Sequence, residues 1–155
     1  MALNPYLLNE VCKRIKPGDR IVSMGYPDIV TPPDQVEFLK GVDLTGLTYR
    51  HDSKEICRRH GRDEFRVPDA ESLFGILGAK LDVYDIVQER GTEILCDLNE
   101  DIQINPVNKY NFVLDVGTLE HCFNIATAMM NMAGLVEIDG LIMHENPFNW
   151  GNHGF

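Results

Sequence analysis

Three acidic residues stand near the ends of short, β-rich runs of this chain. They are Asp85, Asp97 and Asp115, in or after the runs at 81–86, 93–98 and 110–116. A carboxylate presents two acceptor oxygens, so Asp85 can accept both hydroxyls of a ribose. In the same way, Asp97 can accept a hydrogen bond from the amino group of a base, while Leu98 packs on the ring of that base. The plain alternative is that these residues only form turns or cap helices.

Histidines supply the second kind of chemistry. His121 follows Glu120 at the start of a helical pattern and can orient or deprotonate a hydroxyl or an amine. Three further polar residues near the end of the chain are expected to contact a substrate, namely His144, Asn146 and His153. His144, Glu145 and His153 are also suitable metal ligands, but their spacing matches no motif such as HExxH. We therefore expect no metal site.

Strands and helices alternate along the chain, and these elements must position the polar residues. Strands are predicted over residues 20–25, 81–86, 93–98, 110–116 and 140–148, and helices over 5–15, 32–40, 54–60, 70–77 and 118–136. Asn4, Asp69, and either Asp52 or Ser53 have the types and positions of helix caps, and 28–33 is predicted as loop. Strands that are almost continuously apolar indicate a parallel sheet covered on both faces. Such sheets bind ligands at the carboxyl ends of their strands, where the strand order reverses.

Composition limits the classes of protein that remain. The chain has 155 residues and a formal net charge of −10, which argues against a protein that binds nucleic acid by neutralising phosphates. No apolar run approaches the length of a membrane span, and the N-terminus does not have the pattern of a secretory leader. The four cysteines lie far apart and form no CxxC pair, so we expect reduced thiols in a cytoplasmic protein.

One stretch departs from this acidic character. It contains six of the fourteen lysines and arginines, namely Arg50, Lys54, Arg58, Arg59, Arg62 and Arg66. The stretch is a candidate anion site. The alternative is a solvated basic helix face that offsets acidic neighbours.

The segment from Tyr110 to Phe155 carries a recognisable pattern. It runs YNFVLDVGTLEHCFNIATAMMNMAGLVEIDGLIMHENPFNWGNHGF and resembles the class I S-adenosylmethionine-dependent methyltransferases, in which the fourth strand leads through a small residue into a helix that opens with LEH. Asp139-Gly140 stands where that family usually has a Pro-Gly-Gly turn. Together with ESLFGILGA, LDVYDI and ILCDLN upstream, the chain is similar to a subgroup marked by GTLEH and a downstream NHGF or DHGF. The resemblance covers about residues 69–155, and more faintly 20–30.

This resemblance implies a single α/β domain with a Rossmann-like, mostly parallel sheet and helices on both faces. Residues 1–19 would hold an N-terminal helix, and 20–155 the cofactor-binding sheet with a helical insertion at about 31–78. The implied cofactor is S-adenosylmethionine, and the residues expected to bind it are Gly25, Tyr26, Asp85, Asp97, Leu98, Asp115, Gly117 and Glu120. Aromatic and acidic groups such as Tyr26, Asp115 and Glu120 suit its sulfonium charge. His121 is the candidate catalytic residue, acting on a small-molecule, sugar or lipid-linked acceptor.

The sequence also departs from the family. After the first strand the family has an acidic residue followed by GxGxG, whereas SMGYPDI keeps only Gly25 and places Pro27 and Ile29 at the other glycine positions. The chain stops at Phe155, before the last helix and hairpin of the family, so we expect a C-terminally truncated fold and a possible homodimer. One rival function is a non-catalytic methyltransferase-like binding or interaction module. A nicotinamide-dependent oxidoreductase would need GxGxxG after Val22 and a Tyr-x-x-x-Lys group, and the chain has neither.

Overall fold

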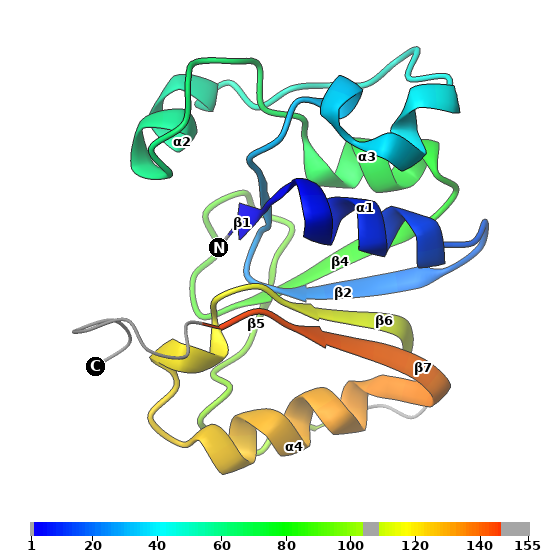
Figure 1. Cartoon of the computed structure of the whole chain (residues 1–155). Coiled ribbons are helices and arrows are strands. Elements are labelled where there is room, and N and C mark those ends of the chain that lie inside the picture. Colours follow the sequence, from blue (N-terminus) through cyan, green and yellow to red (C-terminus); the bar gives the residue numbers. More distant parts are fainter. Residues whose placement is uncertain (1, 104–108, 147–155) are drawn as a thin grey trace. The chain divides into compact units, whose positions relative to one another are not determined.

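The computed structural model describes residues 2–103 and 109–146 (Figure 1). The chain divides into two compact units. We call the first the sheet unit; it contains residues 19–26 and the described part of 82–155. The second, which we call the helical unit, contains residues 2–18 and 27–81. Each is described by itself below.

The sheet unit is built on a five-stranded parallel sheet. The strands of this sheet are β2 (Arg20–Met24), β4 (Lys80–Asp85), β5 (Ile94–Leu95), β6 (Tyr110–Asp115) and β7 (Val136–His144), and all but the first two residues of β4 belong to the sheet unit. Their order in space is β5-β4-β2-β6-β7. From β2, the strands β4 and β5 therefore continue in one direction, and β6 and β7 continue on the other side. This reversal between β2 and β6 is compatible with a Rossmann-like α/β fold.

The central strands owe their place to continuous apolar sequence. Ile21 and Val22 of β2 pair in parallel with Phe112 and Val113 of β6, and all four side chains are buried. Strands with such runs are typical of the inside of a parallel sheet. The predicted strand at 93–98 is reduced to the two residues of β5, because only Ile94 and Leu95 pair with the end of β4.

Helix α4 (Ile125–Leu135) covers one face of this sheet (Figure 1). Its side chains Ala128, Met132 and Leu135 are buried in the main apolar core of the unit. The predicted helix over 118–136 is wrong in one respect, because the chain forms a separate 3-10 turn at Leu119–His121 and then becomes extended at Cys122. Asn124 caps the new helix by accepting a hydrogen bond from the Thr127 amide at 3.3 Å.

Strand β7 begins earlier than predicted and contains an irregularity. Tyr110 pairs with Val136, whereas Phe112 pairs with Leu141, so β7 carries extra residues between these two pairs. Asp139 adopts a φ of 64° in this bulge. A Cβ atom at Gly140 would lie 3.0 Å from the Asn111 carbonyl oxygen, so the bulge requires glycine there.

The helical unit contains three α-helices that the capping signals predict. They are α1 (Pro5–Arg14), α2 (Ser53–Arg59) and α3 (Ala70–Ile76). Asn4 accepts a hydrogen bond from the Leu7 amide at 3.0 Å, and Asp69 accepts one from the Ser72 amide at 3.1 Å. Both caps are confirmed. Asp52 occupies the cap position of α2 without a side-chain capping bond.

Two other predictions for this unit are wrong. The segment 32–40 forms two 3-10 helices, Pro33–Gln35 and Glu37–Gly41, rather than one α-helix. The segment 28–33 is not all loop, because β3 (Asp28–Ile29) pairs in parallel with β1 (Ala2–Leu3). Pairing between strands of two residues depends on tertiary contacts, which a short sequence window does not reveal.

The basic stretch at 50–66 is largely neutralised within the unit. Buried Asp28 lies 3.4 Å from the Arg50 guanidinium and 3.0 Å from Nε2 of His60. The other pairs are Arg50 with Asp52, Lys54 with Glu64, Arg58 with Glu55 and Arg59 with Asp28, while Arg66 lies over the Tyr49 ring. These contacts favour the alternative of a charge-compensated surface over an anion site.

None of the helices in the two described ranges has both the length and the apolar character that crossing a membrane requires.

Candidate functional site

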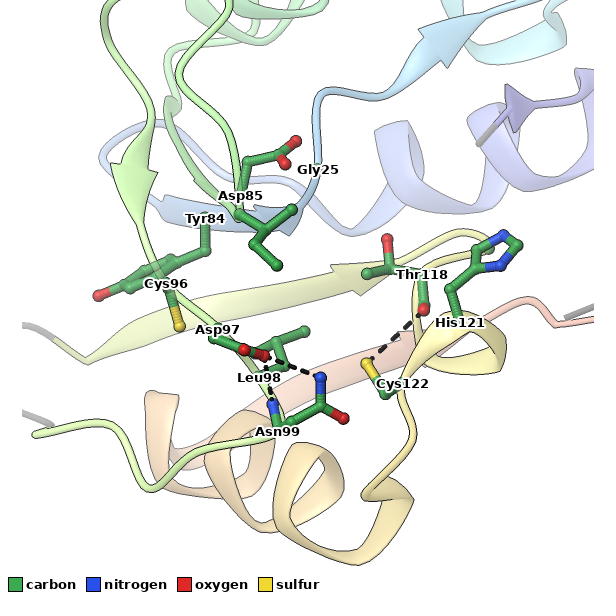
Figure 2. A pocket seen from close by; sticks show the side chains of 12 residues that line it. Gly25, Tyr84, Asp85, Cys96, Asp97, Leu98, Asn99, Thr118, His121 and Cys122 are labelled. Atoms are coloured by element: carbon green, nitrogen blue, oxygen red, sulfur yellow. Dashed lines mark hydrogen bonds between the residues drawn. The ribbon is translucent and has the colours of Figure 1, made fainter. Parts of the chain in front are cut away.

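A cavity of about 330 Å³ lies in the sheet unit at the carboxyl ends of β2, β4, β5 and β6 (Figure 2). It is lined by Gly25, Tyr84, Asp85, Ile86, Cys96, Asp97, Leu98, Asn99, Gly117, Thr118, His121 and Cys122. Its position coincides with the point between β2 and β6 where the strand order reverses, which is where open α/β sheets bind ligands.

The cavity brings together about half of the residues predicted from the sequence. Six of them line it, namely Gly25, Asp85, Asp97, Leu98, Gly117 and His121. The predicted residues Tyr26, Asp115, Glu120, His144 and Asn146 are not among its lining. His153 lies outside the described residues.

The ends of β2 and β4 are tied together at the cavity. The Gly25 amide donates a hydrogen bond to the Tyr84 carbonyl oxygen at 2.7 Å, and Gly25 has a φ of 75°, which favours glycine. Asp85 follows as the last residue of β4 and is half-buried. Its Oδ1 accepts a hydrogen bond from the Val87 amide at 3.2 Å. The carboxylate is thus held at the cavity by a turn of its own chain.

A second carboxylate stands after β5. Asp97 Oδ1 accepts hydrogen bonds from the Asn99 amide at 2.9 Å and from the Asn99 side chain at 2.8 Å (Figure 2). These bonds lower the pKa of Asp97, so the group is ionised at neutral pH. Buried Leu98 lies between the two polar residues. This edge of the cavity therefore combines a negative charge, an amide and an apolar side chain.

Helix α4 fixes the shape of this loop. The Asn131 side chain is buried and donates to the carbonyl oxygens of Leu98 at 3.1 Å and Glu100 at 2.8 Å. Its own oxygen accepts a hydrogen bond from the Ile102 amide at 3.2 Å. One side chain thereby satisfies three backbone groups of the loop, which stabilises the conformation that presents Leu98 to the cavity.

The opposite side of the cavity is formed by the turn after β6. Thr118 Oγ1 donates to the Met24 carbonyl oxygen at 2.6 Å, which connects this turn to the end of β2. Gly117 has a φ of 95°, another conformation that favours glycine. Figure 2 shows Thr118 and His121 across the cavity from Asp97. The His121 side chain is 57% exposed, and its Nε2 lies 3.8 Å from Glu120 Oε1.

Asp115 lies behind this turn and is completely buried. Its Oδ1 accepts hydrogen bonds from the Thr118 and Leu119 amides, both at 3.0 Å. Its Oδ2 lies 2.9 Å from His144 Nδ1 and accepts a hydrogen bond from the Asn146 side chain at 2.8 Å. Asp115 therefore connects two of the other predicted residues with the cavity wall, although it does not line the cavity itself.

Two further predicted residues have contacts of their own. The Tyr26 ring is covered by the Arg90 guanidinium, whose central carbon lies 3.7 Å from the ring centroid. This is a cation–π contact with a side chain of the same chain. The Glu120 amide donates to the Asn146 side-chain oxygen at 3.3 Å. Neither residue presents its predicted group as part of the cavity lining.

The two cysteines of the cavity behave as neutral groups. Burial is the main cause that raises the pKa of Cys96 and of Cys122, and the Asp97 and Asp115 carboxylates respectively add to it. A thiol with a raised pKa stays protonated at neutral pH and is a poor nucleophile or metal ligand. In the described part of the chain, no group of three or more His, Cys, Asp or Glu side chains is arranged to hold a metal ion.

Sequence reasoning missed three residues that shape the site, namely Asn99, Thr118 and Asn131. Asn131 left a signal, because it is a polar residue in the otherwise apolar buried stripe of Ala128, Met132 and Leu135. Such a residue must find hydrogen-bond partners outside its helix. Asn99 and Thr118 gave no comparable signal, since polar residues are ordinary in turns.

The strand order, the cavity and the polar groups around it are the basis for assigning a function. The geometry provides two carboxylates, an amide and an apolar surface at one edge of a parallel sheet. No protein-family model, no curated protein and no solved structure matches the chain.

Proposed function

We propose that this chain binds S-adenosylmethionine in the cavity and transfers its methyl group to a small-molecule, sugar or lipid-linked acceptor. The observation that carries the proposal is the placement of Asp85 and Asp97 around one cavity at the reversal of the strand order. The resemblance of residues 69–155 to class I methyltransferases leads to the same assignment. A non-catalytic methyltransferase-like module is the alternative that the experiment below must separate from it.

The lining residues fit the chemical groups of this cofactor. Asp85 stands where a carboxylate accepts the two ribose hydroxyls of a nucleoside. Asp97 and Asn99 offer acceptors and a donor for the edge of an adenine, and Leu98 offers an apolar surface for its ring. Bound there, S-adenosylmethionine supplies an electrophilic methyl group on a positively charged sulfur. The negative charges at the cavity favour such a cation over an anion.

The path of the chain after β2 supports this cofactor over a dinucleotide. A dinucleotide places its pyrophosphate at the N-terminus of a helix that directly follows the glycine turn. Here Gly25 is followed by Pro27 and by strand β3 at Asp28–Ile29, not by a helix. S-adenosylmethionine carries no phosphate and does not need that helix. The loss of the other two glycines is thus compatible with a nucleoside ligand.

The proposal includes a reducing, cytosolic setting. All four cysteines are free, with Cys12, Cys57 and Cys122 buried. Free cysteines are usual in proteins that work where thiols stay reduced.

Calorimetric titration tests the proposal. We expect S-adenosylmethionine and S-adenosylhomocysteine to bind the purified chain and NAD not to bind. Substitution Asp85→Asn keeps the shape of the side chain but removes its charge and one acceptor. It should weaken binding by about tenfold to a hundredfold, as for loss of one or two hydrogen bonds to a charged group.

The matched control is Asp101→Asn, which makes the same chemical change at an exposed carboxylate that does not line the cavity. Its affinity should equal that of the wild type. No heat with either sulfur ligand at millimolar concentration would overturn the proposal. Binding without methyl transfer to any acceptor in a small-molecule extract would instead favour the non-catalytic module.

A further inference from the structure

Asp115 and His144 lie directly opposite each other on neighbouring strands. They are register partners at the carboxyl ends of β6 and β7, so the sheet backbone itself brings the two side chains together. Asp115 is completely buried, and His144 Nδ1 lies 2.9 Å from its Oδ2. The sheet therefore fixes both the distance and the direction of this contact.

The surroundings of the carboxylate determine which ring nitrogen of His144 carries the proton. Asp115 accepts hydrogen bonds from three other donors, the Thr118 and Leu119 amides and the Asn146 side chain. A carboxylate surrounded by donors acts as an acceptor toward His144 as well. Nδ1 must then carry the hydrogen and donate it. In the neutral imidazole this leaves Nε2 unprotonated, with its lone pair available.

His144 is accessible on its other side. Its side chain is 35% exposed, whereas the Asp115 side chain is not exposed at all. The ring is thus anchored at a buried charge through Nδ1, while about a third of the side chain stays exposed. This is the arrangement in which a carboxylate orients an imidazole and stabilises the imidazolium that forms after proton uptake.

The same carboxylate links His144 with the cavity. Asp115 Oδ1 holds the backbone of the turn that places Thr118 in the cavity wall, while Oδ2 holds His144. The Glu120 amide also donates to Asn146, which is itself bonded to Asp115. Any displacement of the cavity wall is therefore coupled to the position of the imidazole through shared hydrogen bonds.

We propose that His144 Nε2 is the proton acceptor for the methyl acceptor's hydroxyl or amine, and that Asp115 is its positioning residue. This inference rests on the proposed function and names the group that the sequence patterns had assigned only to substrate contact. As the bond between the acceptor's oxygen or nitrogen and the methyl carbon forms, the carbon–sulfur bond of S-adenosylmethionine would break, its electron pair staying on sulfur to give S-adenosylhomocysteine. The acceptor's proton passes to Nε2, and the N–H bond that forms leaves an imidazolium paired with Asp115. The imidazolium then returns the proton to solvent, which completes the balance.

Nuclear magnetic resonance of the ¹⁵N-labelled protein tests the pair without any activity. Long-range ¹H–¹⁵N correlations at neutral pH should show His144 as the tautomer with hydrogen on Nδ1. In Asp115→Asn, the amide at this position should remove that preference. Asn146→Ala keeps the carboxylate and is the matched control, so its tautomer should be that of the wild type. Hydrogen on Nε2 in the wild-type protein would overturn the proposal even if the variants failed to fold.

Carbethoxylation with diethyl pyrocarbonate provides the chemical readout, because an unprotonated imidazole nitrogen attacks the carbonyl carbon of this reagent. Peptide mapping should show modification of His144 in the wild type and its loss in Asp115→Asn, while exposed His51 serves as internal reference in both. Unchanged modification of His144 in Asp115→Asn would contradict the positioning role. Calorimetry with S-adenosylmethionine separates the two proposals, since its failure leaves the tautomer result intact and disproves only the methyl-transfer setting.

Discussion

Burial sets the protonation of single residues in the helical unit as well as at the cavity. Cys12 lies on the buried side of α1, and burial raises the pKa of its thiol to about 12. An ordinary thiol has a pKa of about 8.5. The folded chain therefore keeps a proton on Cys12 over a pH range in which the unfolded chain loses it.

This difference predicts that stability falls at alkaline pH. The contribution of Cys12 is fully present below the ordinary thiol pKa of about 8.5, and it is lost progressively as pH rises toward about 12, because only the unfolded chain releases the proton. Urea unfolding at pH 8, 9.5 and 10.5 should show a steeper decline of the free energy of unfolding for the wild type than for Cys12→Ala. Equal declines in both proteins would show that Cys12 is not the cause.

The sequence predicts a site residue where a polar residue or a glycine directly follows an apolar run, because such a position marks the end of a strand. Asp85, Asp97 and Gly117 follow apolar runs, and parallel strands bring such positions to one edge. Asp115 also ends a strand, but its side chain points into the protein interior and not into the cavity, so it positions other residues and does not line the cavity. The sequence contains no sign of that direction, which depends on donors from β7 and from the turn at 117–121.

At the scale of elements, two capping signals were confirmed by a hydrogen bond, whereas Asp52 makes no side-chain capping bond and the segment 32–40 forms no α-helix. Asn4 and Asp69 predict their helices because a cap needs only the next few residues. The apolar pattern over 118–136 predicts one helix, yet Asn124 begins a new one, and that cap signal was present in the sequence. The pairing of β1 with β3 joins residues far apart in the chain and could not be predicted from either segment alone.

Helix α4 offers a test of how an element supports the cavity. Asn131→Leu introduces an apolar, helix-compatible side chain of similar size and leaves the carbonyl oxygens of Leu98 and Glu100 and the Ile102 amide without this partner. We expect a loss of roughly 2–4 kcal/mol in the free energy of unfolding and weaker binding of S-adenosylmethionine. Urea unfolding and calorimetry measure the two effects.

Met130→Leu is the matched control on the same helix, because Met130 is 71% exposed. Its stability should change by less than about 0.5 kcal/mol. If Asn131→Leu were as stable as this control and bound the ligand equally well, the loop would not depend on α4.

For the whole molecule, the division into two units confines the proposed ligand to one of them. Every residue that lines the cavity belongs to the sheet unit. The helical unit has its own core cluster of Val30, Ile56, Cys57 and Val67 and its own ion pairs around Asp28. Each unit thus has apolar contacts and polar pairs of its own, and the residues that would contact the ligand all belong to the sheet unit.

Hydrogen–deuterium exchange can follow this difference. A ligand at 100 times its Kd stabilises the state that binds it by about 2.7 kcal/mol, or about a hundredfold in the opening equilibrium. With S-adenosylmethionine, peptides that cover 84–86, 96–99 and 117–122 should exchange more slowly by up to this factor. Peptides of α1 in the helical unit are the internal control and should change least. Uniform protection of both units would contradict a site confined to the sheet unit.

The parallel pairing of β2 with β6 determines which segments of the chain must be present together to form the cavity. Ile21 and Phe112 are register partners, and the cavity takes Gly25 from one side of this pairing and Gly117 from the other. No continuous stretch of the chain that omits either strand contains the cavity, however well it preserves the GTLEH motif. Ligand binding thus depends on the pairing of two strands that lie far apart in the sequence. A grafted peptide that carries only the GTLEH motif would lack the residues that β2 and β4 contribute to the cavity, and we expect it not to bind.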